Sequence, residues 1–283
     1  MEIDNVAILL ATFNGGKYLG EQIESIINQS YKKWHLFIHD DGSTDNTLNI
    51  VKYYCQEDNR IMIFDDENLH LGPFKGYMKM LSEITAPLYM FCDQDDIWSN
   101  TKIEDSIDSY KLCLKDNPNS AIIVHTDVTV VDEKLNILAL SHWRDTNIVP
   151  NKLKSYHYLA LCDYVQGNTM LLNNEAKALS LPAPDYVDLH HDWWIATRVI
   201  RNGGIIETLD KTTVLYRQHD DNVCGFRYGK QNRIINRLFH IKEVFISLLS
   251  NYKMVKRDGF GGFGLYLWVK FKLILHMHLK SNY

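Results

Sequence analysis

The chain has few of the features that mark secreted, zinc-binding or membrane-spanning proteins. Its five cysteines are odd in number and widely spaced and form no C-x-x-C pair, so neither a disulfide framework nor a structural zinc site is indicated. The apolar run VAILL (6–10) is too short to span a bilayer and follows acidic residues, where a signal peptide would be basic. No G-x-G-x-x-G follows the first apolar run, which disfavours a dinucleotide-binding turn. We expect a protein of the reducing cytosol.

Charge divides the chain near residue 226. Residues 227–283 contain eleven Lys or Arg against two acids, a balance of +9, whereas the upstream residues carry 19 basic and 33 acidic side chains, a balance of −14. An acidic body repels polyanions, so nucleic acid is not an expected partner. With 283 residues and 46% hydrophobic content, we expect one large α/β domain at 1–226. A basic, aromatic-rich helical tail is expected at 227–283.

Strand-like and helix-like segments alternate over the first 92 residues. Short apolar runs at 6–13, 34–40, 60–65 and 87–92 have the length of buried strands, and apolar residues at helical spacing follow the first three. This alternation predicts a mostly parallel central sheet flanked by helices, with ligands at the carboxyl ends of the strands. Further strands are predicted at 121–132, 167–173 and 212–219, and a helix at 190–204.

The segment YMFCDQDDIW (89–98) places Asp93, Asp95 and Asp96 directly after a core strand. Crowded carboxylates repel one another and lose solvation, which a bound cation would offset. A hard divalent ion, Mg²⁺ or Mn²⁺, suits such oxygen ligands. The alternative is a solvated turn in which Asp96 caps a helix that begins near Ile97.

A second acidic cluster, HDDGSTDNT (39–47), follows another predicted strand. Neighbouring strand ends in a parallel sheet would bring Asp40 and Asp41 into one crevice with Asp93. A nucleotide would fit there, because a carboxylate accepts from a pyrimidine N–H or a ribose hydroxyl while a metal holds the diphosphate. The alternative is a turn that caps the next helix through Asp45 or Ser43.

Five motifs occur in an order that resembles the inverting family-2 glycosyltransferases of the GT-A fold. They are ATFNGGKYLGEQIESIINQSY, IHDDGSTDNT, ENLHLGP, FCDQDDIW and HDWW, and the resemblance runs from about Val6 to Asn222. YRQHDDNVCG (216–225) further resembles the bacterial rhamnosyltransferase branch that serves cell-surface polysaccharide synthesis.

The resemblance implies roles for the donor side of the site. In such enzymes the carboxylate at the position of Asp41 recognises the base, and the ENLHLG loop closes over the nucleotide. The D-x-D element binds Mn²⁺ or Mg²⁺ and the ribose-diphosphate; either Asp95 or Asp96 is its main metal ligand, and Asp95 is favoured. Residues implied to bind the nucleotide sugar are Thr12, Phe13, Asn14, Asp41, Asn68, Gly72 and Asp93, and those implied for the metal are Asp93, Asp95 and Asp96. Arg217 and His219 follow a strand-like segment and are suited to holding the diphosphate or completing the metal shell; the alternative for His219 is a structural turn residue.

The resemblance also implies a general base. The family's Glu-Asp pair at a helix start corresponds here to His191 and Asp192, so His replaces the Glu. Trp193 beside Asp192 would exclude water and offer a flat face to a sugar. On the acceptor side we also expect Gln166 and Gly167, where glycine permits a close approach. The alternative for Asp192 is a structural N-cap of the helix.

These residues predict a single displacement that inverts the anomeric carbon. Asp192 would deprotonate a hydroxyl of a growing cell-surface glycan or lipid-linked acceptor, and the oxygen would attack a nucleotide-activated sugar. The resemblance favours L-rhamnose from dTDP-rhamnose as the donor. A UDP-hexose-using enzyme of the same fold and an inactive sugar-nucleotide-binding protein are the alternatives. A phosphotransferase with an aspartyl nucleophile is disfavoured, because the first strand ends in TFNGG and lacks D-x-D-x-T.

The tail allows two interpretations. Its apolar residues Ile234, Leu238, Ile241, Phe245, Leu248 and Val255 fall roughly on one helical stripe, and LYLWVKFKLILHMHL (265–279) is apolar with scattered Lys and His. Such helices pack on their own domain or on a twin subunit. With its positive charge, the tail is equally suited to peripheral attachment to the inner face of the plasma membrane.

Overall fold

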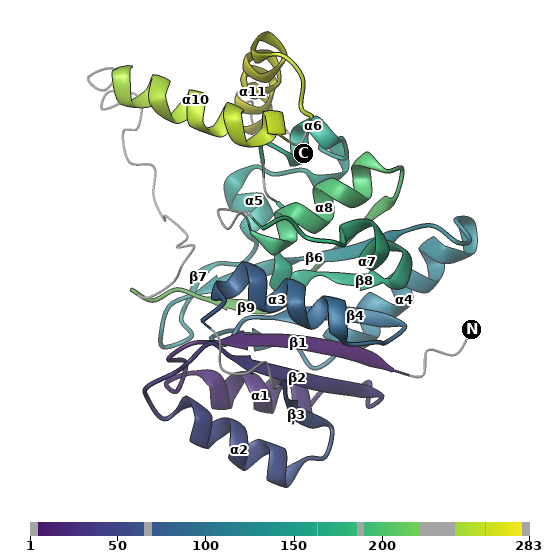
Figure 1. Ribbon diagram of the computed structural model, residues 1–283, viewed down its shortest axis with the longest axis vertical. Coiled ribbons are helices and arrows are strands. Elements are labelled where there is room, and N and C mark those ends of the chain that lie inside the picture. Colours follow the sequence, from purple (N-terminus) through teal and green to yellow (C-terminus); the bar gives the residue numbers. More distant parts are fainter. Residues whose placement is uncertain are drawn as a thin grey trace.

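The computed structural model describes residues 5–64, 70–162, 164–185, 190–220, 241–257 and 259–278, apart from the side chains of 241–247, 250 and 278. Figure 1 shows helices packed on a large central sheet. Within the described residues the sheet has nine strands, and its main path runs β3-β2-β1-β4-β8-β6-β9-β5. The predicted α/β class and the mostly parallel sheet are confirmed.

The first half of the sheet is entirely parallel. It consists of β1 (Val6–Thr12), β2 (Trp34–Asp40), β3 (Ile61–Ile63) and β4 (Leu88–Cys92), and β1 pairs with both β2 and β4. Residues 6–10 of β1 are fully buried, as expected for a parallel strand with helices on both faces. The crossover helices are α1 (Leu19–Ile27), α2 (Thr47–Glu57) and α3 (Gly72–Glu83).

The second half is mixed. The short strand β8 (Leu171–Asn173) runs antiparallel to β4 and to β6 (Ile122–Val131), and β9 (Ile205–Arg217) runs parallel to β6. Two minor strands complete it, because β5 (Ile97–Trp98) pairs with β9 and β7 (Ile137–Ala139) pairs with β6. Because β8 is antiparallel to both of its neighbours, β4 and β6 run in the same direction, and so does β9. The carboxyl ends of β4 and β9 and the amino end of β8 therefore meet at one edge.

Two apolar cores cover the two faces of the sheet. Ala7 and Leu9 of β1 belong to one core with α3 and α8 (His191–Arg201), whereas Ile8 and Leu10 belong to the other with α1, α2 and α4 (Lys102–Asp116). The first core also receives α7 (Asn174–Ser180) and the short helices α5 (His142–Thr146) and α6 (Tyr156–Leu159). Single turns of 3-10 helix lie at Pro150–Lys152 and Gly167–Thr169.

The tail forms α10 (Ile241–Arg257) and α11 (Phe263–His278). Figure 1 shows both helices at one end of the long axis, beside α6. Val255, Phe260 and Tyr266 are buried in the first core, so this part of the tail packs on its own domain. Ile234 and Leu238 of the predicted stripe lie outside the described residues. None of the described helices has the length and apolar composition needed to cross a membrane.

Three predicted elements need correction. Gly167–Thr169 form a 3-10 turn, so the strand predicted at 167–173 keeps only its last three residues. The strand predicted at 212–219 begins earlier, at Ile205, because Gly203, with φ 80°, ends the preceding helix and returns the chain to the sheet. No helix begins near Ile97; that residue is in β5, opposite Leu215, a pairing with a partner distant in sequence.

His125 makes the folding stability of the protein dependent on pH. The side chain is fully buried in β6, with its Nε2 3.0 Å from Thr208 Oγ1. Burial lowers the pKa of His125 from 6.5 to about 3. The unfolded chain therefore binds this proton at a higher pH than the folded chain does. The stabilisation is complete above pH 6.5 and is lost as the pH falls, by about 2 kcal/mol at pH 5.

Replacing the histidine should remove this contribution. The variant His125→Gln can keep the hydrogen bond to Thr208. Between pH 7 and pH 5 we expect its free energy of unfolding to fall by about 2 kcal/mol less than that of the wild type. Urea unfolding at the two pH values measures the difference. Equal losses in the two proteins would show that His125 accepts its proton without unfolding.

Candidate active site

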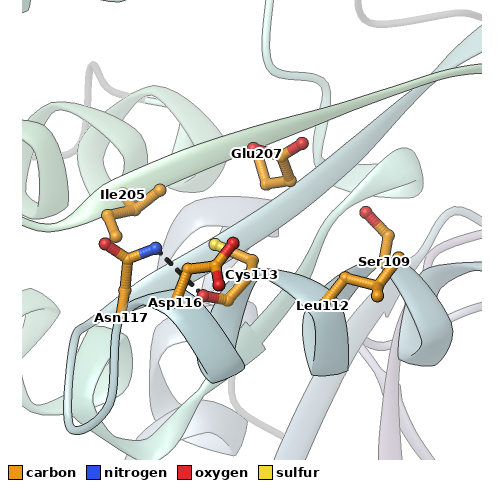
Figure 2. Close-up of a pocket in the computed structure, with 7 residues that line it drawn as sticks. All are labelled: Ser109, Leu112, Cys113, Asp116, Asn117, Ile205 and Glu207. Atoms are coloured by element: carbon orange, nitrogen blue, oxygen red, sulfur yellow. Dashed lines mark hydrogen bonds between the residues drawn. The ribbon is translucent and has the colours of Figure 1, made fainter.

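The candidate site lies at the sheet edge where β1, β2, β4 and β9 end. Another depression, with a volume of about 440 Å³, is lined by α4 and by Ile205 and Glu207 (Figure 2). These two residues lie at the amino end of β9, and the strand extends ten residues beyond Glu207 to Arg217. That depression is therefore at the opposite edge of the sheet, and it holds none of the predicted site residues.

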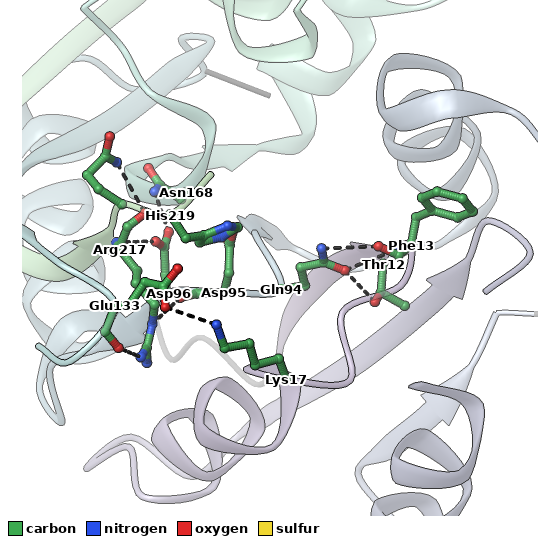
Figure 3. A network of polar contacts seen from close by, with 11 residues as sticks. Thr12, Phe13, Lys17, Gln94, Asp95, Asp96, Glu133, Asn168, Arg217 and His219 are labelled. Atoms are coloured by element: carbon green, nitrogen blue, oxygen red, sulfur yellow. Dashed lines mark hydrogen bonds and ion pairs between the residues drawn. The ribbon is translucent and has the colours of Figure 1, made fainter. Parts of the chain in front are cut away.

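The turn after β1 is fastened to the aspartate segment by Gln94. Its Oε1 accepts from Thr12 Oγ1 at 2.6 Å and from Phe13 N at 2.9 Å (Figure 3). Asn14 has φ 47°, and its side-chain oxygen accepts from Thr44 N at 2.8 Å, which joins the turn to the segment after β2. A Cβ at Gly15 would lie 2.3 Å from Gln94 Oε1, so a larger residue here would displace the Gln94 side chain. The predicted residues Thr12 and Phe13 thus contact Gln94, and Asn14 contacts the segment after β2.

Asp41 connects the end of β2 to the start of α3. Its carboxylate accepts from Leu71 N at 2.5 Å and from Gly72 N at 3.1 Å, and it lies 3.3 Å from His39 Nε2. Gly72 has φ 71°, a conformation that favours glycine. The structure thus brings the predicted residues Asp41 and Gly72 into contact. Asn68 lies outside the described residues.

The alternative interpretation of the second acidic cluster holds only in part. Asp45 accepts from Thr47 N and from Gly16 N, both at 3.0 Å, so it is a turn residue. The N-cap of α2, however, is Asn46. Ser43 Oγ accepts from Asn14 N at 2.8 Å, which places it against the first turn and not at the helix end.

The negative charge of Asp93 is unfavourable in the absence of a bound cation. Burial, followed by the charge of Asp95, raises its pKa to about 7, and the charge of Asp192 adds to the rise. Tyr77 donates a hydrogen bond to its Oδ1 at 3.0 Å, which opposes the rise. A cation at this position would remove the repulsion, so the donor set fits a hard divalent ion.

Asp95 lies against His219. The Asp95 Oδ2 and His219 Nε2 atoms are 2.7 Å apart, and the His219 ring packs on Tyr18 at a centroid distance of 4.9 Å. Among the described residues no three His, Cys, Asp or Glu side chains gather tightly enough to hold a metal by themselves. Asp93 and Asp95 would therefore need oxygens from a diphosphate or water to complete a coordination shell.

Asp96 differs from the other two aspartates. It is 0% exposed, and its two oxygens accept from Asn168 Nδ2 at 2.5 Å and from Arg217 N at 3.2 Å (Figure 3). Burial raises its pKa well above the usual value, and burial also lowers the pKa of nearby Lys102 to about 7. This geometry favours Asp95 over Asp96 as the metal ligand and gives Asp96 the task of joining three chain segments. The predicted helix cap at Asp96 is wrong.

Arg217 is engaged by the protein itself. The residue is 2% exposed; its Nε donates to Asp95 O and its Nη1 to Glu133 O, both at 2.9 Å. Its Nη2 pairs with Glu21, and the guanidinium lies over the Tyr18 ring. The structure therefore differs from the expected direct contact with a diphosphate. Arg217 instead holds the main chain of Asp95 in place.

Asp192 is the second residue of α8. Its Oδ2 accepts from Gly167 N at 2.8 Å and its Oδ1 from Trp193 N at 2.7 Å. The N-cap is His190, so the alternative that Asp192 caps the helix is wrong, although a carboxylate in the first turn is favoured by the helix dipole. A Cβ on Gly167 would lie 2.4 Å from His191 Nε2. Glycine thus allows the turn that follows Gln166 to approach Asp192.

The two tryptophans belong to the core. Trp193 and Trp194 are 6% and 7% exposed, and their indole N–H groups donate to Ala160 O and Ser180 O. The expectation that Trp193 offers an open face to a sugar is therefore wrong. His191 is also buried, between Tyr77 and Phe91, and burial lowers its pKa to about 4. These rings fix the start of α8 and with it Asp192.

Sequence reasoning passed over two residues that shape the site. Gln94 stands at the variable position of D-x-D. Its hydrogen bonds with Thr12 and Phe13, which are distant in sequence, show that it holds the turn after β1 in place. Tyr77 lies within α3, where its periodicity indicates a core residue, yet its hydroxyl reaches Asp93 Oδ1. Asn168 was expected on the acceptor side with Gln166 and Gly167, and the structure places its side-chain amide against Asp96.

Comparison with known proteins defines the class. The family model for glycosyl transferase family 2 matches residues 7–171. The dTDP-rhamnosyl transferase RfbG of Shigella flexneri is 30% identical over 260 residues, which cover 83% of this chain and 82% of RfbG. A further relative, the putative teichuronic acid biosynthesis glycosyltransferase TuaG of Bacillus subtilis, is 30% identical over 104 residues, only 40% of its length.

Solved structures share the fold. TarS of S. aureus in complex with UDP-GlcNAc has a TM-score of 0.59 at 17% identity, and the match covers 80% of this chain and 62% of TarS. The mannosyltransferase PcManGT from Pyrobaculum calidifontis, in complex with GDP-Man and Mn²⁺, has a TM-score of 0.57 at 17% identity and covers 97% of this chain and 70% of its own. The chain is a nucleotide-sugar glycosyltransferase with a GT-A-like fold. It belongs to glycosyl transferase family 2.

The three aspartates after β4 should respond differently to removal of charge. We expect Asp93→Asn and Asp95→Asn each to weaken Mn²⁺ binding, in the presence of a pyrimidine nucleoside diphosphate, by roughly tenfold or more. Asp96→Asn is the matched control: it should change Mn²⁺ affinity by less than roughly threefold but destabilise the fold by about 1 kcal/mol. The EPR signal of free Mn²⁺ and urea unfolding measure the two effects. Loss of Mn²⁺ binding in Asp96→Asn would make Asp96 a ligand.

Proposed function

We propose that this protein is a metal-dependent inverting glycosyltransferase that moves a sugar from a nucleotide diphosphate donor to a hydroxyl of a growing cell-surface glycan or lipid-linked glycan. The observation that carries the proposal is one electrostatic cluster: the charges of Asp95 and Asp192 both raise the pKa of Asp93 at the carboxyl edge of the sheet. The candidate metal ligands and the candidate base therefore lie close enough to interact electrostatically.

The donor side is assigned to the first two strand ends. Thr12, Phe13, Asn14, Asp41 and Gly72 surround the point where β1 and β2 end, with the Phe13 ring half exposed. A base placed there would meet an aromatic surface and a carboxylate that accepts from N–H groups. Mn²⁺ or Mg²⁺ on Asp93 and Asp95 would neutralise the diphosphate and favour its departure.

Asp192 is assigned as the general base. It is held by Gly167 N and by its own helix start, so the carboxylate is fixed before an acceptor arrives. In the proposed step it takes the proton of the acceptor hydroxyl while the oxygen attacks the anomeric carbon and the nucleoside diphosphate leaves. Attack from the face opposite the leaving group inverts the configuration. Gln166 and Gly167 border the acceptor side.

The favoured donor is dTDP-L-rhamnose. Its support is the likeness to RfbG, which extends over most of both chains. A UDP-hexose is the second candidate, since TarS, of similar fold, holds UDP-GlcNAc. With these substrates we assign the enzyme to the cytoplasm, on the inner face of the plasma membrane where a lipid-linked acceptor would lie. An inactive protein that only binds sugar nucleotides is the remaining alternative.

Donor identity can be tested without knowing the acceptor. We expect dTDP-rhamnose with Mn²⁺ to raise the melting temperature more than UDP-glucose, UDP-GlcNAc or GDP-mannose, because only ligands of the folded state stabilise it. Thermal unfolding with each donor, with and without chelator, measures the effect, and release of nucleoside diphosphate reports slow hydrolysis. A larger shift with a UDP-hexose would replace rhamnose as the donor; binding without any turnover would indicate the inactive protein.

Removing the charge of Asp192 should separate chemistry from binding. We expect Asp192→Asn to lower transfer by roughly 10²–10⁴-fold, because the amide cannot take a proton. The amide oxygen can still accept from Gly167 N, so the donor Kd should stay within roughly threefold of wild type. Transfer assays and donor titration measure the two quantities, with Asp116→Asn on the exposed end of α4 as the control. Full activity in Asp192→Asn would refute the assignment.

A further inference from the structure

Helix α11 has apolar side chains on its outer surface as well as its inner one. Tyr266, Val269 and Leu273 recur at helical spacing and are buried against the domain. The outer face, defined here as the α11 lipid face, is exposed and made of large apolar side chains. They are Leu265 (38% exposed), Leu267 (42%), Trp268 (53%), Phe271 (59%), Ile274 (44%) and Leu275 (41%).

The neighbouring helix shows what an ordinary surface helix looks like in this chain. In the last turns of α10, Val255 is buried while Lys253, Lys256 and Arg257 are exposed. Such a division between an apolar inner face and a charged outer face is typical of helices that meet water. Six large apolar side chains on the outer face of α11 depart from this pattern, which indicates that another surface covers them.

The charged residues in the sequence of α11 and beyond it are all basic. No Asp or Glu occurs between 259 and 283, whereas Lys270, Lys272 and Lys280 do. The Lys272 Nζ atom lies 3.8 Å from the Trp268 ring centroid, so an ammonium group borders the exposed indole. Residues 227–240 add four basic side chains and no acid to the sequence of the tail. A partner that matches this surface is apolar beneath and anionic on top.

We propose that the α11 lipid face docks on an anionic lipid bilayer, with the helix lying in the plane of the headgroups. Sixteen residues of helix extend about 24 Å, which is shorter than a membrane span. The apolar side chains enter the acyl boundary, while Lys272 reaches back to the phosphates. A second copy of the chain matches less well, because a two-fold contact through this face would bring the lysines of both copies together.

The position of α11 leaves the candidate active site free. Both tail helices lie beside α6, at the end of the long axis away from α2 (Figure 1). Asp93 and Asp95 follow β4, in the middle of the sheet order. A chain attached through α11 therefore keeps its sheet edge outside the bilayer. Attachment does not depend on which sugar the enzyme transfers, so it can fail while the proposed function stands.

Vesicle flotation of the full chain tests the proposal. Vesicles of phosphatidylglycerol and phosphatidylcholine should bind the protein at low salt, and vesicles of phosphatidylcholine alone should bind it more weakly. We expect the double variant Trp268→Ser, Phe271→Ser to lose binding by roughly tenfold or more. Leu112→Ser is the matched control, because Leu112 is 70% exposed on α4, outside the lipid face, and its replacement should leave binding unchanged. Unaltered melting of each variant shows that the fold is intact.

Two further measurements separate lipid from protein partners. Lys272→Gln should weaken binding to the anionic vesicles by roughly fivefold. Lipids brominated in the acyl chain should quench tryptophan fluorescence of the wild type and quench Trp268→Phe much less, although that variant still binds. If the wild-type protein binds neither kind of vesicle, the proposal is wrong. It is also wrong if the wild type is a dimer that the double variant dissociates, since that result assigns the face to a second copy.

Discussion

Repulsion among the aspartates that follow β4 is the constraint on which the site depends. Three carboxylates within four residues cannot all stay charged beside a buried strand unless each has its own neutralising contacts. The structure separates them: Asp95 lies against His219, Asp96 receives two hydrogen bonds in the interior, and Asp93 is left with a pKa of about 7. The unfavourable charge is thereby concentrated where a cation and a diphosphate are expected. Stability is lost at the position where binding can restore it, as is common in functional sites.

One short turn connects the aspartates that follow β4 to the candidate base, Asp192. In the 3-10 turn Gly167–Thr169, Gly167 N donates to Asp192 and the next residue, Asn168, donates to Asp96. Asp96 also accepts from Arg217 N, and the Arg217 side chain holds Asp95 O. Segments from β4, β8, α8 and β9 are thus joined through a few hydrogen bonds. This network fixes the position of the candidate base, Asp192, relative to the candidate metal ligand Asp95.

The amino-terminal half of the fold could be predicted from the sequence because its information is local. Short apolar runs that alternate with amphipathic helices usually fold into a parallel sheet covered by helices, and β1 to β4 are parallel in the structure. The location of Asp41 and Asp93 at the carboxyl ends of parallel strands could be predicted from that arrangement. The interior position of Asp96 and the engaged guanidinium of Arg217 did not, because both depend on partners more than seventy residues away. For the same reason the buried indole of Trp193 was mistaken for an exposed one: its partner, Ala160 O, is remote in sequence.

The reversal of direction at β8 has a consequence for how the two halves of the sheet are coupled. This strand of three residues joins a parallel half that carries the candidate nucleotide-binding turns to a half that carries the candidate base and the tail. Besides β8, contacts of Asn168, Arg217 and His219 with Asp95 and Asp96 connect the second half to the aspartates after β4. A change in the second half that moved these three residues would therefore be transmitted to the aspartates, whereas a change elsewhere in that half would leave these contacts in place.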